Sequence, residues 1–135
     1  MGRVGANPRL YDADSDVPVL HGVRCSRCER VYFPPISIGC ESCGAQDLVP
    51  ANLTPSGTVF AAATVHLHPG DTPVPFTIVE VLLDSGPLIR ALVHPEAGDP
   101  EIGSRVVGTW LITATDGENQ TIEPAFIPAP SEEAR

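Results

Sequence analysis

The residues of this chain best suited to chemistry are its four cysteines, which form two Cys-x-x-Cys pairs. Cys25 is paired with Cys28 and Cys40 with Cys43, and residues 29–39 separate the two pairs. A spacing of two residues lets a tight turn direct both sulfurs to one point, and two such turns supply the four thiolates of a tetrahedral zinc site. The sequence therefore predicts a zinc centre held by all four cysteines.

The residues around these pairs favour a zinc ribbon. Gly44 follows the second pair and tolerates the left-handed backbone that such turns use, whereas Glu29 stands at that place in the first pair and makes the match imperfect. Residues 31–36 are β-prone and then bent by prolines, as expected of a hairpin arm. Four protein ligands leave no position open for water, so we expect the metal to stabilise the fold rather than to react.

Other uses of the cysteines stay open at this stage. A rubredoxin-type iron centre or an iron–sulfur cluster takes the same ligands, and two disulfides are a further alternative. Disulfides are rare in cytosolic proteins, and we expect a cytoplasmic location because no signal peptide precedes the cluster. Three arginines, Arg24, Arg27 and Arg30, crowd the first pair. They either offset the charge of a four-thiolate centre or are solvated surface residues.

The charge of the chain argues against two classes of partner. Its 135 residues carry a formal net charge of −9, and all eight basic residues are arginines. Such a charge repels phosphate backbones, so we expect no nucleic-acid binding. The sequence holds no apolar run of about twenty residues, so we expect no membrane span.

The chain divides into four expected segments. After a polar, acidic stretch come the ribbon, a second domain of alternating apolar residues, and a polar tail expected to be disordered. The expected bounds are residues 1–18, 19–53, 54–128 and 129–135.

Five strands without a helix are expected in the second domain. A small sheet of five strands joined mostly by hairpins removes its exposed edges by closing into a barrel, and the five-stranded version is the OB-fold. The predicted fold class is therefore mainly β, with an N-terminal rubredoxin-like zinc ribbon followed by a five-stranded OB-fold barrel that packs on it. The expected strands are residues 58–68, 76–83, 88–94, 105–115 and 120–127.

An ordered set of short motifs resembles one known family. The chain is similar, over about residues 19–128, to the zinc-ribbon/OB-fold proteins catalogued as domain of unknown function thirty-five. No single motif is specific to this family, but the order in which the motifs occur is. The motifs are Arg24 with the first cysteine pair, Tyr32-Phe33-Pro34-Pro35, the second pair with Gly44, Ser56-Gly57-Thr58-Val59, Pro75-Phe76-x-Ile78, Asp84-Ser85-Gly86-Pro87 and Ile102-Gly103.

This resemblance implies a non-catalytic accessory subunit that binds and stabilises a thiolase-like enzyme acting on acyl-CoA thioesters. In archaeal relatives the subunit bridges a thiolase and the next synthase of the mevalonate route. In actinobacterial sterol catabolism, related domains pair with a sterol-carrier-type thiolase that acts as a retro-aldolase, and they associate with an enoyl-CoA hydratase. The arginine-only, alanine- and proline-rich composition favours the second setting. We therefore expect a hetero-oligomer with an aldolase or acyltransferase in steroid side-chain degradation, with an acyl-CoA ligand in the complex.

Outside the cysteines, no residue set predicts catalysis by the chain itself. It has no Ser-His-Asp order, no nucleophile elbow and no glycine-rich phosphate loop. Two histidines end the first expected barrel strand, where they would share a face, and a proline-rich loop follows them. Surface histidines without a role are the alternative. The candidate contacts with a partner or an acyl-CoA are His66, His68, Pro73, Pro75 and Phe76.

Two further side chains have expected positions in the barrel. Glu80 interrupts an apolar run, and because an unpaired buried carboxylate is costly, it should pair with an arginine such as Arg90 or reach the barrel rim. Trp110 is expected in the core, with an interface anchor as the alternative.

Two other functions are alternatives to the accessory subunit. One is a nucleic-acid-binding zinc-ribbon/OB protein, which the low aromatic content of 5% and the missing basic stripe disfavour. The other is a free-standing acyl-CoA-binding protein.

Overall fold

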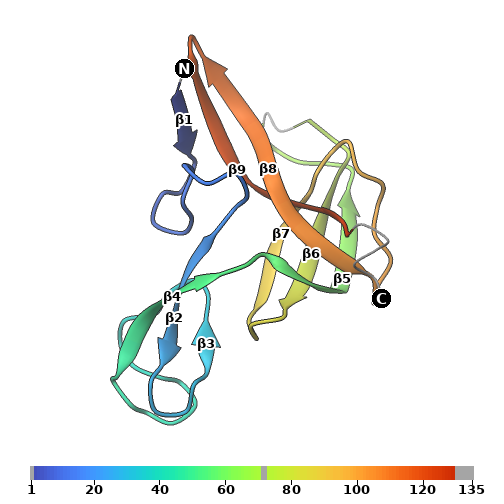
Figure 1. Cartoon of the computed structure of the whole chain (residues 1–135). Coiled ribbons are helices and arrows are strands. Elements are labelled where there is room, and N and C mark those ends of the chain that lie inside the picture. The colour runs from blue at the N-terminus through green and yellow to red at the C-terminus, as the bar shows by residue number, and fades with distance from the viewer. Residues whose placement is uncertain (1, 71–72, 130–135) are drawn as a thin grey trace.

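The computed structural model describes residues 2–70 and 73–129, and these residues form strands, turns and loops without a helix. Three strands make one sheet in the order β3-β2-β4, and six make a second sheet that includes a barrel. Figure 1 shows the small sheet at one end of the molecule and the barrel beside it. The strands are β1 (Gly2–Gly5), β2 (Leu20–Cys25), β3 (Val31–Tyr32), β4 (Leu48–Leu53), β5 (Ser56–Val65), β6 (Phe76–Leu83), β7 (Leu88–Val93), β8 (Arg105–Asp116) and β9 (Asn119–Pro128).

The barrel is closed by the pairing of β5 with β8. Around its wall the strands follow the order β5-β6-β7-β9-β8, and β8 then returns to β5. Within this wall β7 and β9 run parallel, through Leu92↔Ala125 and Val93↔Phe126, and the other neighbours run antiparallel. A five-stranded barrel of this kind is an OB-fold. The predicted fold class, a zinc ribbon followed by a five-stranded OB-fold barrel, is confirmed.

Strand β5 differs from its prediction, whereas the later strands agree with theirs. The bounds of β6 are those predicted, those of β7 and β8 differ by one residue at their C-terminal end, and those of β9 by one residue at each end. The sequence predicts an alternating strand over residues 58–68, but β5 spans Ser56–Val65 and contains a β-bulge between Val59 and Ala61. A bulge adds an unpaired residue and breaks the period of two. The predicted alternation is therefore wrong beyond Val59, where buried and exposed side chains no longer take turns.

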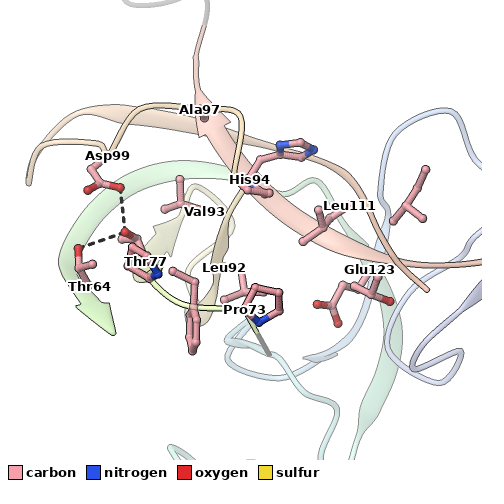
Figure 2. Close-up of a pocket in the computed structure, with 15 residues that line it drawn as sticks. Thr64, Pro73, Thr77, Leu92, Val93, His94, Ala97, Asp99, Leu111 and Glu123 are labelled. Carbon is pink, nitrogen blue, oxygen red and sulfur yellow. Dashed lines mark hydrogen bonds between the residues drawn. The ribbon is translucent and has the colours of Figure 1, made fainter. Parts of the chain in front are cut away.

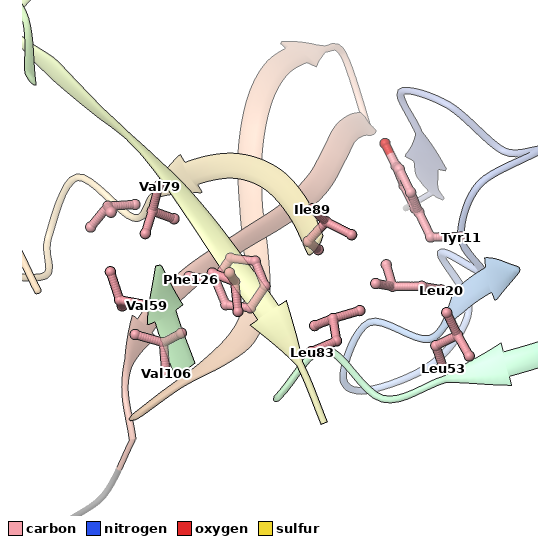
Figure 3. Close-up of a cluster of buried hydrophobic side chains, with 11 residues drawn as sticks. Tyr11, Leu20, Leu53, Val59, Val79, Leu83, Ile89, Val106 and Phe126 are labelled. Atoms are coloured by element: carbon pink, nitrogen blue, oxygen red, sulfur yellow. The ribbon is translucent and has the colours of Figure 1, made fainter. Parts of the chain in front are cut away.

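One continuous core joins the barrel to the base of the ribbon. Figure 3 shows Phe126 at its centre and the ribbon residues Leu20 and Leu53 on one side. Phe126 is 1% exposed and Leu20 2%. Because burial of one such side chain contributes about 1.5–3 kcal/mol, this cluster packs ribbon and barrel together, as the sequence predicts. Its buried members are Tyr11, Leu20, Leu53, Val59, Val79, Val81, Leu83, Ile89, Val93, Val106 and Phe126.

The N-terminal segment, for which the sequence predicts no strand, adds one to the barrel sheet. Strand β1 pairs in parallel with the first part of β9. Tyr11 holds the segment in place, because its buried hydroxyl donates to the carbonyl of Ile122 at 3.1 Å and accepts the N–H of Asn7 at 2.9 Å. The sequence does not predict β1, because a strand of four residues with glycine at both ends shows no periodicity and its pairing partner is more than a hundred positions away.

Trp110 lies on β8 where the N-terminal segment crosses it. Its indole Nε1 donates to the carbonyl of Ser15 at 2.9 Å, and its ring centroid is 5.7 Å from that of Tyr11. The guanidinium of Arg3 lies 5.4 Å from the ring centroid on the ring face. The indole packs against the core but remains half-buried. It therefore makes the expected core contact while joining the barrel to the N-terminal segment.

Two ion pairs among the described residues link elements of the barrel. Glu80 on β6 pairs with Arg90 on β7 at 2.9 Å, which confirms the predicted pairing. Arg105, at the start of β8, donates two hydrogen bonds of 2.7 Å to Asp84 in the β6–β7 turn, and one of 3.2 Å to Ser56. These bonds from Arg105 lower the pKa of the Asp84 carboxyl. This arginine ties β8 to β5 and to the β6–β7 turn where the barrel closes.

Two further expectations concern the membrane and the tail. In the described parts of the chain, no helix has the length and apolarity needed to cross a membrane. The predicted disordered tail, residues 129–135, lies outside the described residues from position 130 onward. The segment bounds given in the sequence analysis stay predictions.

Gly57 lets β5 pass close to β6, and a side chain there does not fit. A Cβ atom on Gly57 would overlap the carbonyl oxygen of Leu82 and lie 2.9 Å from the Cα of Leu83, both of them backbone atoms. We expect Gly57→Ala to destabilise the zinc-bound protein by about 2–4 kcal/mol, because paired strands must separate. Gly98→Ala is the control, since a Cβ there meets no atom within 4 Å. Denaturation followed by circular dichroism measures both, and equal midpoints would contradict the prediction.

Candidate functional site

The four cysteine sulfurs converge between the two turns of the ribbon. All four Sγ atoms lie within 4.8 Å of one another, with Cys25 and Cys43 3.6 Å apart and Cys28 and Cys40 3.5 Å apart. Zinc binds thiolates at about 2.3 Å in a tetrahedron, so its sulfurs are about 3.8 Å from one another. A disulfide needs about 2.05 Å, and all four cysteines are free. The donor set and its spacing fit zinc, and the described residues contain no other such His, Cys, Asp or Glu group.

Two matching turns direct these sulfurs. The N–H of Glu29 donates to the carbonyl of Cys25 at 2.8 Å, and that of Gly44 donates to the carbonyl of Cys40 at 2.9 Å. Both residues have left-handed backbone angles, with φ of 68° at Glu29 and 78° at Gly44. The first turn therefore has the same geometry as the second although it lacks the glycine. For a residue with a side chain, this conformation costs about 1–2 kcal/mol.

Tyr32, on β3, contributes a hydroxyl to the metal centre that the cysteine spacing does not reveal. The hydroxyl donates to Sγ of Cys40 at 3.2 Å and accepts the N–H of Glu41 at 3.1 Å. The bond from Tyr32 is the main cause that lowers the pKa of the Cys40 thiol to about 6, and it raises the pKa of Tyr32. It thus favours the thiolate, which is the form that binds metal. The sequence feature that points to Tyr32 is the predicted hairpin arm, residues 31–36, because this arm lies between the two cysteine pairs and contains the tyrosine.

One of the three arginines near the first cysteine pair has a defined place. The guanidinium of Arg30 lies 5.8 Å from the centroid of the Tyr32 ring, in the geometry of a cation–π contact. It therefore contacts the side chain that donates to Cys40.

The other candidate contact residues divide into two groups. His66 and His68 are exposed and lie beyond the end of β5, so the prediction that they share a strand face is wrong. The reason is that β6, the strand that pairs with β5 there, begins only at Phe76. The ring of His68 instead meets the ring of Phe76 edge-on, with centroids 5.6 Å apart. Pro73 and Pro75 join Phe76 in the lining of a groove of about 790 Å³.

This groove contains one carboxylate with a partner and one without. Figure 2 shows Asp99 and Glu123 on opposite sides of it. Thr77 donates to Asp99 at 2.8 Å, and its hydroxyl is 3.2 Å from that of Thr64. Glu123 has no hydrogen-bond or ion-pair partner among residues 2–70 and 73–129, and its burial raises the pKa of its carboxyl. The sequence does not single out Glu123, because its carboxylate becomes distinctive only when the folded chain buries it in the groove without a partner.

Comparison with known sequences finds similarity to both parts of the chain. Residues 16–49, which include all four cysteines, match the family described as ChsH2, rubredoxin-like zinc ribbon domain. A DUF35 domain-containing scaffold protein of Methanocaldococcus jannaschii is 31% identical over 107 residues. That alignment covers 76% of this chain and 75% of the relative.

Comparison with solved structures extends the similarity to the fold. The structure resembles a chain of the Ltp2-ChsH2(DUF35) aldolase with a TM-score of 0.66 and 28% sequence identity. The match covers 82% of this chain and 85% of that chain. Because the ribbon alone is much shorter than this, the shared structure includes the barrel.

Removal of the Tyr32 hydroxyl tests its role at the zinc centre. We expect Tyr32→Phe to weaken zinc binding by about 10-fold, since hydrogen-bond partners of metal ligands contribute about 10–100-fold in affinity. Competition with a chromophoric chelator measures the affinity. Tyr11→Phe is the matched control, because the Tyr11 hydroxyl also makes two hydrogen bonds, with Asn7 and Ile122, and neither involves a cysteine. Equal zinc affinities in the two variants would rule out this role of Tyr32.

The two left-handed turn positions allow a test of backbone strain. We expect Glu29→Gly to stabilise the zinc-bound protein by about 1 kcal/mol, because glycine adopts a positive φ without steric cost. Gly44→Ala should destabilise it by a similar amount, and since a Cβ at Gly44 meets no atom within 4 Å, only the backbone conformation is affected. Thermal unfolding in excess zinc measures both changes. Shifts of the same sign in the two variants would contradict the prediction.

Proposed function

The chain belongs to the DUF35 family, and we propose that it is a non-catalytic accessory subunit that binds and stabilises a thiolase-like aldolase. The observation that carries this proposal is the similarity to the Ltp2-ChsH2(DUF35) aldolase, which spans both the ribbon and the barrel. The relative described as a scaffold protein supports the same role. A fold alone does not determine function, so the proposal uses sequence and architecture together.

The chemistry of the ribbon supports a structural rather than a catalytic role. Four thiolates complete a tetrahedral zinc site and leave no position for water or substrate. The buried cluster around the metal is small, with Cys25, Cys40 and Ala45 as its members. Because so little apolar surface is buried there, metal binding must supply much of the folding energy of the ribbon tip.

We further propose that the partner is a sterol-carrier-type enzyme acting on acyl-CoA thioesters in steroid side-chain degradation, with an enoyl-CoA hydratase as an additional component. The name Ltp2-ChsH2(DUF35) aldolase supports an aldolase as the partner, and the family resemblance of the motif order supports the acyl-CoA and steroid setting. We propose the cytoplasm as the location, because cysteines that form no disulfides are typical of a reducing compartment. The proposed contacts with the partner or an acyl-CoA are His66, His68, Pro73, Pro75 and Phe76.

Co-purification with a thiolase-like aldolase of the Ltp2 type tests this function. We expect the two chains to form one complex in size exclusion with light scattering, and the aldolase to cleave its acyl-CoA substrate faster with the subunit than without it. The subunit alone should show no turnover.

Two outcomes would contradict the proposed function. One is separate elution of the two chains together with unchanged aldolase activity. The other is tight acyl-CoA binding by the isolated chain in calorimetry without any effect on the enzyme, which would favour a free-standing acyl-CoA-binding protein.

A further inference from the structure

One edge of β8 has no strand partner along most of its length among residues 2–70 and 73–129. Strand β8 pairs with β9 from Val106 to Asp116, but it pairs with β5 only from Arg105 to Val107. The last contact on the β5 side is the N–H of Gly108, which donates to the carbonyl of Pro55 at 2.7 Å. Past that point the edge of β8 opposite β9 is open within the described part of the chain.

The backbone groups on this open edge can be identified. N–H groups of alternate residues in a strand point to the same edge, so those of Trp110 and Ile112 point the same way as that of Gly108. Trp110 is paired with Pro124 on β9, and proline has no N–H with which to bond the carbonyl of Trp110. This agrees with the backbone groups of Trp110 pointing away from β9. An open edge of this kind is a template for one more strand.

This edge borders the groove of about 790 Å³ that Pro73, Pro75 and Phe76 also line. Leu111, Ile112 and Thr113 contribute its β8 side, and Ile112 is 52% exposed. Figure 2 shows Leu111 and Glu123 near each other, and the two are directly paired across β8 and β9. The groove thus brings together apolar surface, an unpaired strand edge and one carboxylate without a partner.

Glu123 determines the charge that this groove accepts. A partly buried carboxylate without a partner is costly, and a cationic donor would remove that cost. The other acid in the groove, Asp99, already accepts a hydrogen bond from Thr77. The chain as a whole has a net charge of −9, so an anionic ligand such as the phosphates of coenzyme A meets repulsion, whereas a basic segment is attracted.

We propose that an extended segment of the aldolase partner adds as a strand to the open edge of β8 and places an arginine or lysine side chain against Glu123. This is recognition by β-strand addition, in which main-chain hydrogen bonds supply affinity and a pocket supplies specificity. The inference rests on the proposed function, because it requires that partner. It goes beyond that function by naming the strand, the carboxylate and the charge of the partner segment.

Two glutamate variants test the proposal with the Ltp2-type aldolase as the probe. We expect Glu123→Gln to weaken the complex by about 10–100-fold, since a hydrogen bond between charged groups is lost. Glu118→Gln removes the same charge from the exposed β8–β9 turn and should leave the affinity unchanged. Neither carboxylate has a hydrogen bond in the described structure, so both variants should fold. Binding is measured by calorimetry at fixed salt, with bound zinc and melting temperature confirming the fold.

Hydrogen exchange supplies a second measurement on the same complex. We expect the amides of Trp110 and Ile112 to become protected when the aldolase binds. A complex that forms with equal affinity for Glu123→Gln and the wild type, and without that protection, would overturn the inference and leave the proposed function intact. Absence of any complex would overturn both. Protection of these amides by an acyl-CoA alone would overturn the inference in favour of a ligand site.

Discussion

The antiparallel pairing of β8 with β9 is the interaction on which the rest of this structure depends. It runs from Val106↔Pro128 to Asp116↔Asn119. One end of this hairpin closes the barrel through β5, and the other receives β1 along its outer side. Because barrel closure, docking of the N-terminal segment and the groove beside Glu123 all use this ladder, a slip in its register would disturb all three together.

The ribbon is stabilised in two different ways along its length. At its tip, the four sulfurs and the bond from Tyr32 to Cys40 form a centre that depends on metal. At its base, Leu20 and Leu53 belong to the same core as the barrel. The ribbon is thereby a fixed extension of the barrel rather than a tethered module, and a partner that contacts one part meets both in a defined arrangement.

Local signals explain which features could be predicted from the sequence. The cysteine spacing predicts the metal centre because the ligands are close together in sequence. Residues 76–83 predict a strand because their apolar, β-prone side chains are adjacent in sequence. The bulge after Val59 and strand β1 depend on pairing with other segments of the chain, and the contact of the Tyr32 hydroxyl with Cys40 depends on how the ribbon folds. The sequence does not single out Glu123 either, because an acid in a strand becomes distinctive only when the fold leaves its carboxylate without a partner.

The crossing of the N-terminal segment over Trp110 gives the molecule an internal optical reporter. This is the only tryptophan in the chain, and its indole N–H is bonded to Ser15 while its ring lies against Tyr11. Detachment of the segment would hydrate the indole and shift its fluorescence emission to longer wavelength. The attachment of residues before the ribbon is therefore visible in the native protein without any added dye.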